Sequence, residues 1–243
     1  MSQIVYIIRH GDRHDYHIGV ENWVKTRPDH IHVHDPPLSD LGRRQAEDLA
    51  KAVPDLFSDV PIHRMVVSPF IRCIETATPL AEKLGHNLCV DDSLREAGLV
   101  DYVEMPPLAD RNVPMLDLEY SSTFMGEQKE SFPQGCLDRC NNVKQKLLEE
   151  RFANENLVVV THAACVVGLV AALLDCKVSE VAAAGPAGVF KLGRDSSTGK
   201  WSALMQNHSE HLSELGSTRP WPRTDGSPGS LDFIACGDAM EWK

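Results

Sequence analysis

The sequence is short of basic residues and of paired cysteine motifs. It holds 24 Lys and Arg against 35 Asp and Glu, which gives a formal net charge of −11. A field of that sign repels nucleic acid and anionic membranes, so we expect neither as a partner. The cysteines number 7, which is odd, and they form no C-x-x-C pair. We therefore expect reduced, buried thiols in a reducing compartment.

Long apolar runs and a leader-like segment are also missing. The longest apolar stretch, residues 157–174, is interrupted by Thr161 and His162, which makes it a poor membrane span. No basic segment precedes the short apolar run at residues 4–8, so a signal peptide is not expected. No linker or internal repeat divides the middle of the chain. We expect one cytoplasmic domain over residues 1–215 and an irregular tail over residues 216–243, whose first part is rich in Pro, Gly and Ser.

Buried strands alternate with helices along the chain. Continuous apolar runs predict strands at residues 4–8, 65–67 and 157–160, and two more are expected at 189–192 and 201–205. Apolar spacings of three and four predict helices over residues 39–57, 138–152 and 163–174. Ser39 is a predicted N-cap, and Ser68-Pro69 predicts the start of a helix that stops at Gly85. The alternation indicates an α/β fold of three layers, with a mostly parallel central sheet and helices on both faces.

Arginine and histidine side chains follow three of the predicted strands. Arg9 and His10 end the first strand, Arg72 lies in the helix after the second, and His162 follows the third. In an open α/β sheet, ligands bind outside the carboxyl ends of the strands, so we expect these residues to converge, with Arg13 one loop further on. Guanidinium groups match phosphate oxygens bidentately, and helix N-termini add unpaired N–H groups.

This residue set predicts a site for a phosphate dianion. A metal site would need more carboxylates or imidazoles and fewer arginines. Like charge nearby should lower the pKa of His10 and keep its imidazole neutral and nucleophilic, while Gly11 allows a close approach of the backbone. The alternatives are a surface role for Arg72 and a hydrogen-bonded core role for His162. Their places at strand ends favour function for both.

The run Arg9-His10-Gly11, with a second histidine after a late strand, resembles the histidine phosphatase superfamily, which includes the phosphoglycerate mutases. The resemblance covers roughly residues 4–212 and includes three further motifs: Pro37-Leu38-Ser39-x-x-Gly42-x-x-Gln45-Ala46, Ser68-Pro69-x-x-Arg72-x-x-Glu75-Thr76 and Val159-Val160-Thr161-His162. It implies the phosphoglycerate mutase-like fold and an attack of His10 on phosphorus that forms a phosphohistidine. It also implies that the phosphoryl oxygens are held by Arg9, Arg13, Arg72 and His162.

The resemblance further implies an acid that protonates the leaving oxygen and then activates water. Glu96 matches the position of that acid best, and Asp12 is the alternative. Mutases usually carry Glu-Ser-x-x-Asn after the glycine, whereas this chain has Asp12-Arg13-His14-Asp15. Arg13 and the run at residues 34–38 are similar to the branch that contains ecdysteroid-phosphate phosphatases and the tyrosine phosphatases that suppress lymphocyte receptor signalling.

We therefore expect a metal-independent phosphomonoesterase that needs no cofactor. Its substrate would be a small-molecule or phosphotyrosine phosphate ester, and a homodimer is left open. The alternatives are a phosphoglycerate mutase-like phosphotransferase and a non-catalytic phosphate-binding or scaffold module of the same fold. Release of inorganic phosphate, as against transfer to a monophosphoglycerate, distinguishes the two enzymes.

Residues 14–37 and about 97–135 fit no regular element, so we expect them to be inserts. The first insert contains His30, His32 and His34, which at alternating positions can reach one metal ion. The preferred interpretation is a polar loop over the active site. A second hypothesis places aromatic and apolar side chains of both inserts in a wall for the leaving group: Tyr16, Trp23, Tyr102, Met105 and Phe124.

Overall fold

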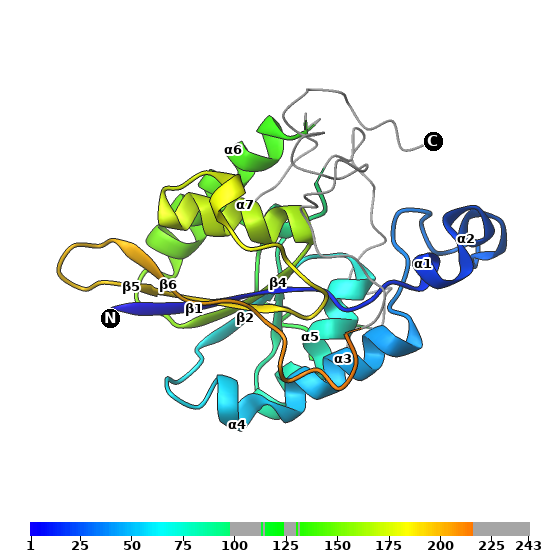
Figure 1. The fold of residues 1–243 in the computed structure, drawn as a ribbon, viewed down its shortest axis with the longest axis horizontal. Coiled ribbons are helices and arrows are strands. Elements are labelled where there is room, and N and C mark those ends of the chain that lie inside the picture. Colours follow the sequence, from blue (N-terminus) through cyan, green and yellow to red (C-terminus); the bar gives the residue numbers. More distant parts are fainter. Residues whose placement is uncertain (98–112, 114, 124–129, 131, 216–243) are drawn as a thin grey trace.

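A mixed sheet of six strands forms the centre of the molecule (Figure 1). The computed structural model describes residues 1–97, 113, 115–123, 130 and 132–215. Within them the strand order is β3-β2-β4-β1-β5-β6. The parallel strands are β1 (Gln3–Arg9), β2 (Arg64–Val67), β3 (Leu88–Val90) and β4 (Leu157–Thr161). The antiparallel strands are β5 (Val189–Arg194) and β6 (Trp201–His208).

Helices cover both faces of this sheet (Figure 1). One face carries α3 (Asp40–Lys51), α4 (Val53–Leu56) and α5 (Ile71–Leu84). The other carries α6 (Gln134–Asn142), a π-helical segment (Val143–Arg151) and α7 (Ala163–Leu174), with Cys140 in the core. Alternate residues of β1 enter the two cores, Val5 and Ile7 on the α7 side and Ile4, Tyr6 and Ile8 on the other. Burial on both faces explains the continuous apolar runs, and the predicted α/β fold is confirmed.

The predicted helix over residues 39–57 is divided in the structure. Ser39 caps α3 as predicted, accepting a hydrogen bond from the Gly42 amide at 3.0 Å. The helix ends at Lys51, and α4 begins anew with Pro54 in its first turn, because proline cannot donate the N–H that a helix interior needs. The short strand β3 was not predicted, since three residues carry too little periodicity to be read.

The predicted start of α5 at Ser68-Pro69 is wrong, although its end at Gly85 is confirmed. The N-cap is Phe70, and the helix begins at Ile71. The Ser68 hydroxyl lies 2.8 Å from Nε2 of His162, so it contacts a residue after the neighbouring strand β4 instead of capping the helix. Gly85 takes the left-handed conformation (φ 72°), in which a side chain would be strained.

The first insert contains two short helices that the sequence did not predict, α1 (His14–Ile18) and α2 (Val20–Thr26). They project beyond the carboxyl end of β1 (Figure 1). Trp23 is buried there, and its indole N–H donates to the Val33 carbonyl at 2.7 Å, so it holds the insert together. Tyr16, in contrast, is 46% exposed.

Much of the second insert lies outside the described residues, as do Tyr102, Met105, Phe124 and the tail over 216–243. In the part of the chain that the structure does describe, no helix has both the length and the apolar character needed to cross a membrane.

Candidate active site

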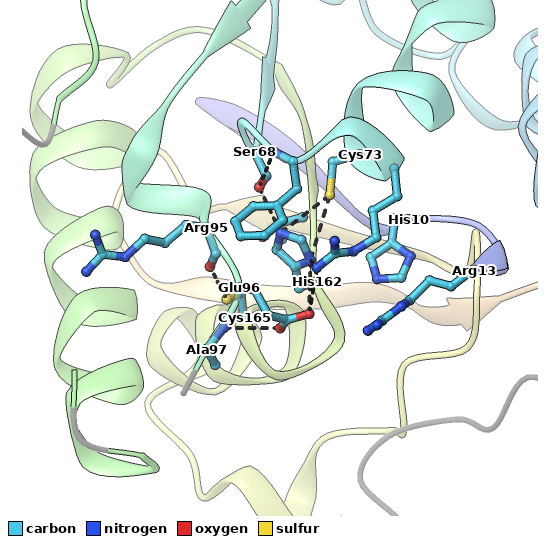
Figure 2. Close-up of polar contacts among 12 residues, drawn as sticks. His10, Arg13, Ser68, Cys73, Arg95, Glu96, Ala97, His162 and Cys165 are labelled. Carbon is cyan, nitrogen blue, oxygen red and sulfur yellow. Dashed lines mark hydrogen bonds and ion pairs between the residues drawn. The ribbon is translucent and has the colours of Figure 1, made fainter. Parts of the chain in front are cut away.

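Two histidines meet at the carboxyl ends of neighbouring parallel strands (Figure 2). His10 follows β1 and His162 follows β4, and the last paired residues of these strands are Arg9 and Thr161. The ring centroids are 5.3 Å apart at an interplanar angle of 64°. Both side chains are buried. The predicted convergence of these two strand ends is therefore observed.

The environment of His10 holds its imidazole neutral. Nδ1 lies 2.7 Å from the Gly11 carbonyl. Because a carbonyl only accepts, Nδ1 must carry the hydrogen, which leaves the lone pair on Nε2. Burial, followed by the positive charges of Arg72 and Arg9, lowers the pKa of His10 well below its usual value. A neutral ring with a free Nε2 lone pair is the form that a nucleophile requires.

The loop after His10 is clamped between α3 and α5. The Gly11 amide donates to Oγ1 of Thr76 at 2.9 Å, and that hydroxyl in turn donates to the Arg72 carbonyl at 2.7 Å. A Cβ on Gly11 would lie 2.8 Å from the Gly42 carbonyl oxygen, which is too close for any real side chain. The close approach that the sequence predicts at Gly11 is therefore an approach to α3.

His162 is completely buried and contacts polar groups through both ring nitrogens. Nε2 lies 2.8 Å from the Ser68 hydroxyl, and Nδ1 lies 3.2 Å from both Arg72 Nη2 and Glu96 Oε2 (Figure 2). Burial lowers the pKa of His162 to about 4, with Arg72 adding to the shift although the Glu96 carboxylate opposes it. The ring is therefore neutral at pH 7, with Nδ1 turned toward Arg72 and Glu96.

Arg72 lies at the first turn of α5 with 1% of its surface exposed, so the alternative surface role is wrong. Its Nη2 lies 3.1 Å from Glu96 Oε2, and its Nη1 donates to the His34 carbonyl at 3.2 Å. The guanidinium also stacks over the Phe70 ring at 4.5 Å. A cation held in this way is pre-organised for an anion beside the two histidines.

Arg9 and Arg13 approach the same space from β1 and the loop after it. Arg9 is buried and donates through Nη1 to the Ala184 carbonyl at 2.9 Å. Arg13 is held bidentately by the buried carboxylate of Asp15, with hydrogen bonds of 3.0 and 2.6 Å. Its side chain extends past His10 toward the side where Glu96 lies (Figure 2).

The structure brings Glu96, and not Asp12, to the histidines. The Glu96 side chain is 24% exposed, and although burial opposes ionisation, His162 and Arg72 lower its pKa well below the usual value. Asp12 is 1% exposed and faces α1 and α3, where its Oδ2 accepts a 2.6 Å hydrogen bond from Ser39 and contacts His17. Glu96 is therefore an ionised, partly exposed carboxylate beside the two histidines.

Among the described residues, His10, Glu96 and His162 are the one group whose ligand atoms could reach a shared metal ion, all within 4.8 Å of one another. Arg72 Nη2 already lies within hydrogen-bonding distance of two of these three residues. A divalent cation there would be repelled by the guanidinium at short range. The residues fit an anion better than a metal ion. The histidine cluster of the first insert is separate from this group: the rings of His32 and His34 lie 5.4 Å apart there.

Three residues that orient the site were not identified from the sequence as functional. Asp15 fixes the Arg13 guanidinium, Ser68 fixes the His162 ring, and Thr76 joins the His10 loop to α5. For Asp15 the sequence offers one indication, a carboxylate two residues after Arg13. The local sequence of Ser68 favours a helix cap and gives no sign of its contact with His162.

Comparisons with known proteins concern the family and the fold of the chain. The sequence matches the histidine phosphatase superfamily (branch 1) over residues 5–207. The search of curated proteins returned no significant match. Ecdysone phosphate phosphatase from Bombyx mori, solved with tungstate, has a similar fold, with a TM-score of 0.63, 17% identity, and coverage of 89% of this chain and 96% of that one.

Two further solved structures share the fold. A phosphoserine phosphatase variant from Entamoeba histolytica, bound to phosphoserine, has a TM-score of 0.57 and 16% identity, with 86% of this chain and 99% of that chain covered. A mycobacterial glucosyl-3-phosphoglycerate phosphatase has a TM-score of 0.55 and 24% identity, with 85% and 99% covered. At these identities the likeness concerns the fold alone.

Proposed function

Because the chain belongs to the histidine phosphatase superfamily, we propose that it is a phosphomonoesterase that works through a phosphohistidine on His10. The observation that carries the proposal is the neutral His10 imidazole, buried beside Arg9 and Arg72 with its Nε2 lone pair free of the Gly11 carbonyl. Such a ring can attack phosphorus without first losing a proton.

Binding would begin with the phosphate dianion displacing the Glu96 carboxylate from Arg72 and His162. Guanidinium groups suit phosphate oxygens, and the neighbouring Arg9 and Arg13 add two more. The arriving negative charge raises the pKa of Glu96, since one partner of its carboxylate is lost and a like charge is gained. Glu96 then takes up a proton and becomes competent as an acid.

In the first chemical step, Nε2 of His10 forms a bond to phosphorus while the bond from phosphorus to the leaving oxygen breaks. Glu96 gives its proton to that oxygen, and the alcohol departs. In the second step, the Glu96 carboxylate takes a proton from water, whose oxygen attacks phosphorus. The N–P bond breaks, inorganic phosphate forms, and His10 returns to its neutral state. The buried arginines stabilise the charge on the phosphoryl oxygens in both transition states.

Hydrolysis is favoured over the mutase-like alternative by the Arg13–Asp15 pair. Asp15 is buried and holds the Arg13 guanidinium bidentately. A small hydroxyl residue, which mutases usually carry at the position of Arg13, would leave this buried carboxylate without its partner. We infer a small-molecule or phosphotyrosine phosphate ester as substrate. Glu96 and the arginines supply all the charges that the steps above use, so turnover should not need a metal ion.

The test is the turnover of p-nitrophenyl phosphate by wild type and His10→Ala, with and without chelator. We expect the kcat of the variant to fall at least about a thousandfold while the protein stays folded. The kcat of the wild type should be the same with and without chelator. His63→Ala, which removes an exposed histidine directly before β2, at the end of the strand away from the site, is the matched control. Trapping the phosphoenzyme should show an acid-labile phosphate in the wild type alone. Near-normal turnover of folded His10→Ala would overturn the mechanism, and loss of wild-type activity with chelator would overturn metal independence.

A further inference from the structure

Arg139 lies in α6 behind the segment that carries Glu96, with 4% of its surface exposed. Its Nε and Nη2 donate to the two carboxylate oxygens of Glu130, at 2.5 and 3.0 Å. Its Nη1 donates to the carbonyls of Ser93 and Arg95, at 2.8 and 3.0 Å. One buried guanidinium therefore binds both a carboxylate and the backbone immediately before Glu96.

The same backbone is held from the β4–α7 junction. Oγ1 of Thr161 donates to the Leu94 carbonyl at 2.6 Å, and the Cys165 thiol donates to the Arg95 carbonyl at 3.1 Å (Figure 2). Thr161 directly precedes His162. The carbonyls of residues 93–95 are thus bound by side chains from α6, β4 and α7, which ties the position of Glu96 to that of His162.

A buried ion pair is a poor source of stability, because removing two charges from water costs about as much as their attraction returns. Its value can instead be geometric, since five fixed donors constrain the groups that they bind. The shortest connection from Arg139 to Glu96 runs through the Arg95 carbonyl and one peptide unit. A displacement of about 1 Å there would break the 3.2 Å contact between Glu96 Oε2 and His162 Nδ1.

We propose that Arg139 is a positioning residue for Glu96, acting with Thr161 to hold the acid beside His162. The inference rests on the proposed role of Glu96 as general acid. Arg139 touches neither the substrate nor the histidines. Its effect should therefore fall on the two proton transfers of Glu96, and only the first of them, to the leaving oxygen, enters kcat/KM.

The readout is the dependence of kcat/KM on the leaving group. A p-nitrophenolate ion can depart without taking up a proton, whereas an alkyl alcohol leaves only if an acid protonates its oxygen. The variants are Arg139→Met and Thr161→Val, compared by kcat/KM on p-nitrophenyl phosphate and on an alkyl phosphate. We expect each to lose at least about tenfold on the alkyl ester and less than about threefold on the aryl ester. Thr78→Val is the matched control, since Thr78 donates only to the Ile74 carbonyl of its own helix, at 2.8 Å.

Glu96→Gln provides the reference and separates two kinds of failure. Adding Arg139→Met to Glu96→Gln should cause no further loss on the alkyl ester. Equal losses on both esters, or a further loss in the double variant, would overturn the positioning role. An unchanged ester ratio in Glu96→Gln itself would overturn the proposed acid instead. If Arg139→Met fails to fold because Glu130 is left unpaired, Thr161→Val, which is nearly isosteric, decides the question.

Discussion

The Glu96 carboxylate lies 3.2 Å from Nδ1 of His162, a ring whose other nitrogen is 2.8 Å from the Ser68 hydroxyl. The contact places a negative charge among the side chains that we expect to bind phosphate. In the mechanism that we propose, Glu96 competes with the phosphate for Arg72 and His162, and it becomes an acid only after the phosphate has displaced it. This competition has a measurable consequence.

Glu96→Gln should change catalysis and phosphate affinity in opposite directions. On an alkyl phosphate we expect kcat/KM to fall by about 10²–10⁴, the usual contribution of a general acid. Inorganic phosphate should inhibit more strongly, because no carboxylate opposes it. Steady-state kinetics with phosphate as a competitive inhibitor measures both effects. Glu82→Gln, on the exposed side of α5, should change neither. Weaker phosphate inhibition in Glu96→Gln would contradict the competition.

Asp12→Asn should reduce stability and leave the leaving-group dependence of kcat/KM unchanged. Asp12 accepts from Ser39 and contacts His17, away from the histidine pair. Replacing one acceptor of a buried network costs about 1–3 kcal/mol of unfolding free energy. Urea denaturation gives the stability, and the aryl and alkyl esters give the dependence. A loss confined to the alkyl ester would identify Asp12, rather than Glu96, as the acid.

Tyr16→Ala should alter discrimination between aryl and small aliphatic phosphates. Tyr16 is 46% exposed, and the Arg13 guanidinium lies 4.5 Å from its ring centroid, so the ring stands beside a cation that we assign to phosphate. An aromatic contact contributes about 0.5–1.5 kcal/mol, which corresponds to a change of roughly two- to tenfold in relative kcat/KM. Val24→Ala, exposed on α2, is the control. An unchanged ratio would remove Tyr16 from the leaving-group site.

Stability should fall as the solution is acidified below the unfolded pKa of histidine, 6.5. Burial lowers the pKa of His162 to about 4 and that of His10 well below 6.5. Between these values the unfolded chain binds more protons than the folded chain, so the free energy of unfolding decreases as the pH falls. Each histidine contributes at most about 1.4 kcal/mol per pH unit. Glu96 acts in the same direction, but only below its own unfolded pKa of 4.5.

Urea unfolding of wild type and His162→Gln between about pH 7 and pH 5 measures this slope. The variant should lose part of it, whereas His30→Ala should keep the wild-type slope, since the pKa shift of His162 comes from burial and His30 is exposed. An identical slope in wild type and His162→Gln would show that His162 does not carry a lowered pKa in the folded protein.

The sequence by itself determined the layers of the fold and most members of the site. Apolar runs such as Ile4–Ile8 reflect burial on both faces of a central strand, and burial is a property that local composition records. Once β1 and β4 are recognised as parallel strands, the convergence of His10 and His162 follows from the carboxyl-end rule.

Only the tertiary structure showed that Glu96, and not Asp12, lies beside His162, and only it showed what Ser68 and Arg139 bind. A side chain chooses its hydrogen-bond partner by distance in space, and these partners are far apart in sequence: 94 positions separate Ser68 from His162, and 44 separate Arg139 from Arg95. The protonation of the histidines was likewise decided by tertiary structure. Desolvation and the charge of Arg72 act on His10 only after two strands and a helix have packed together.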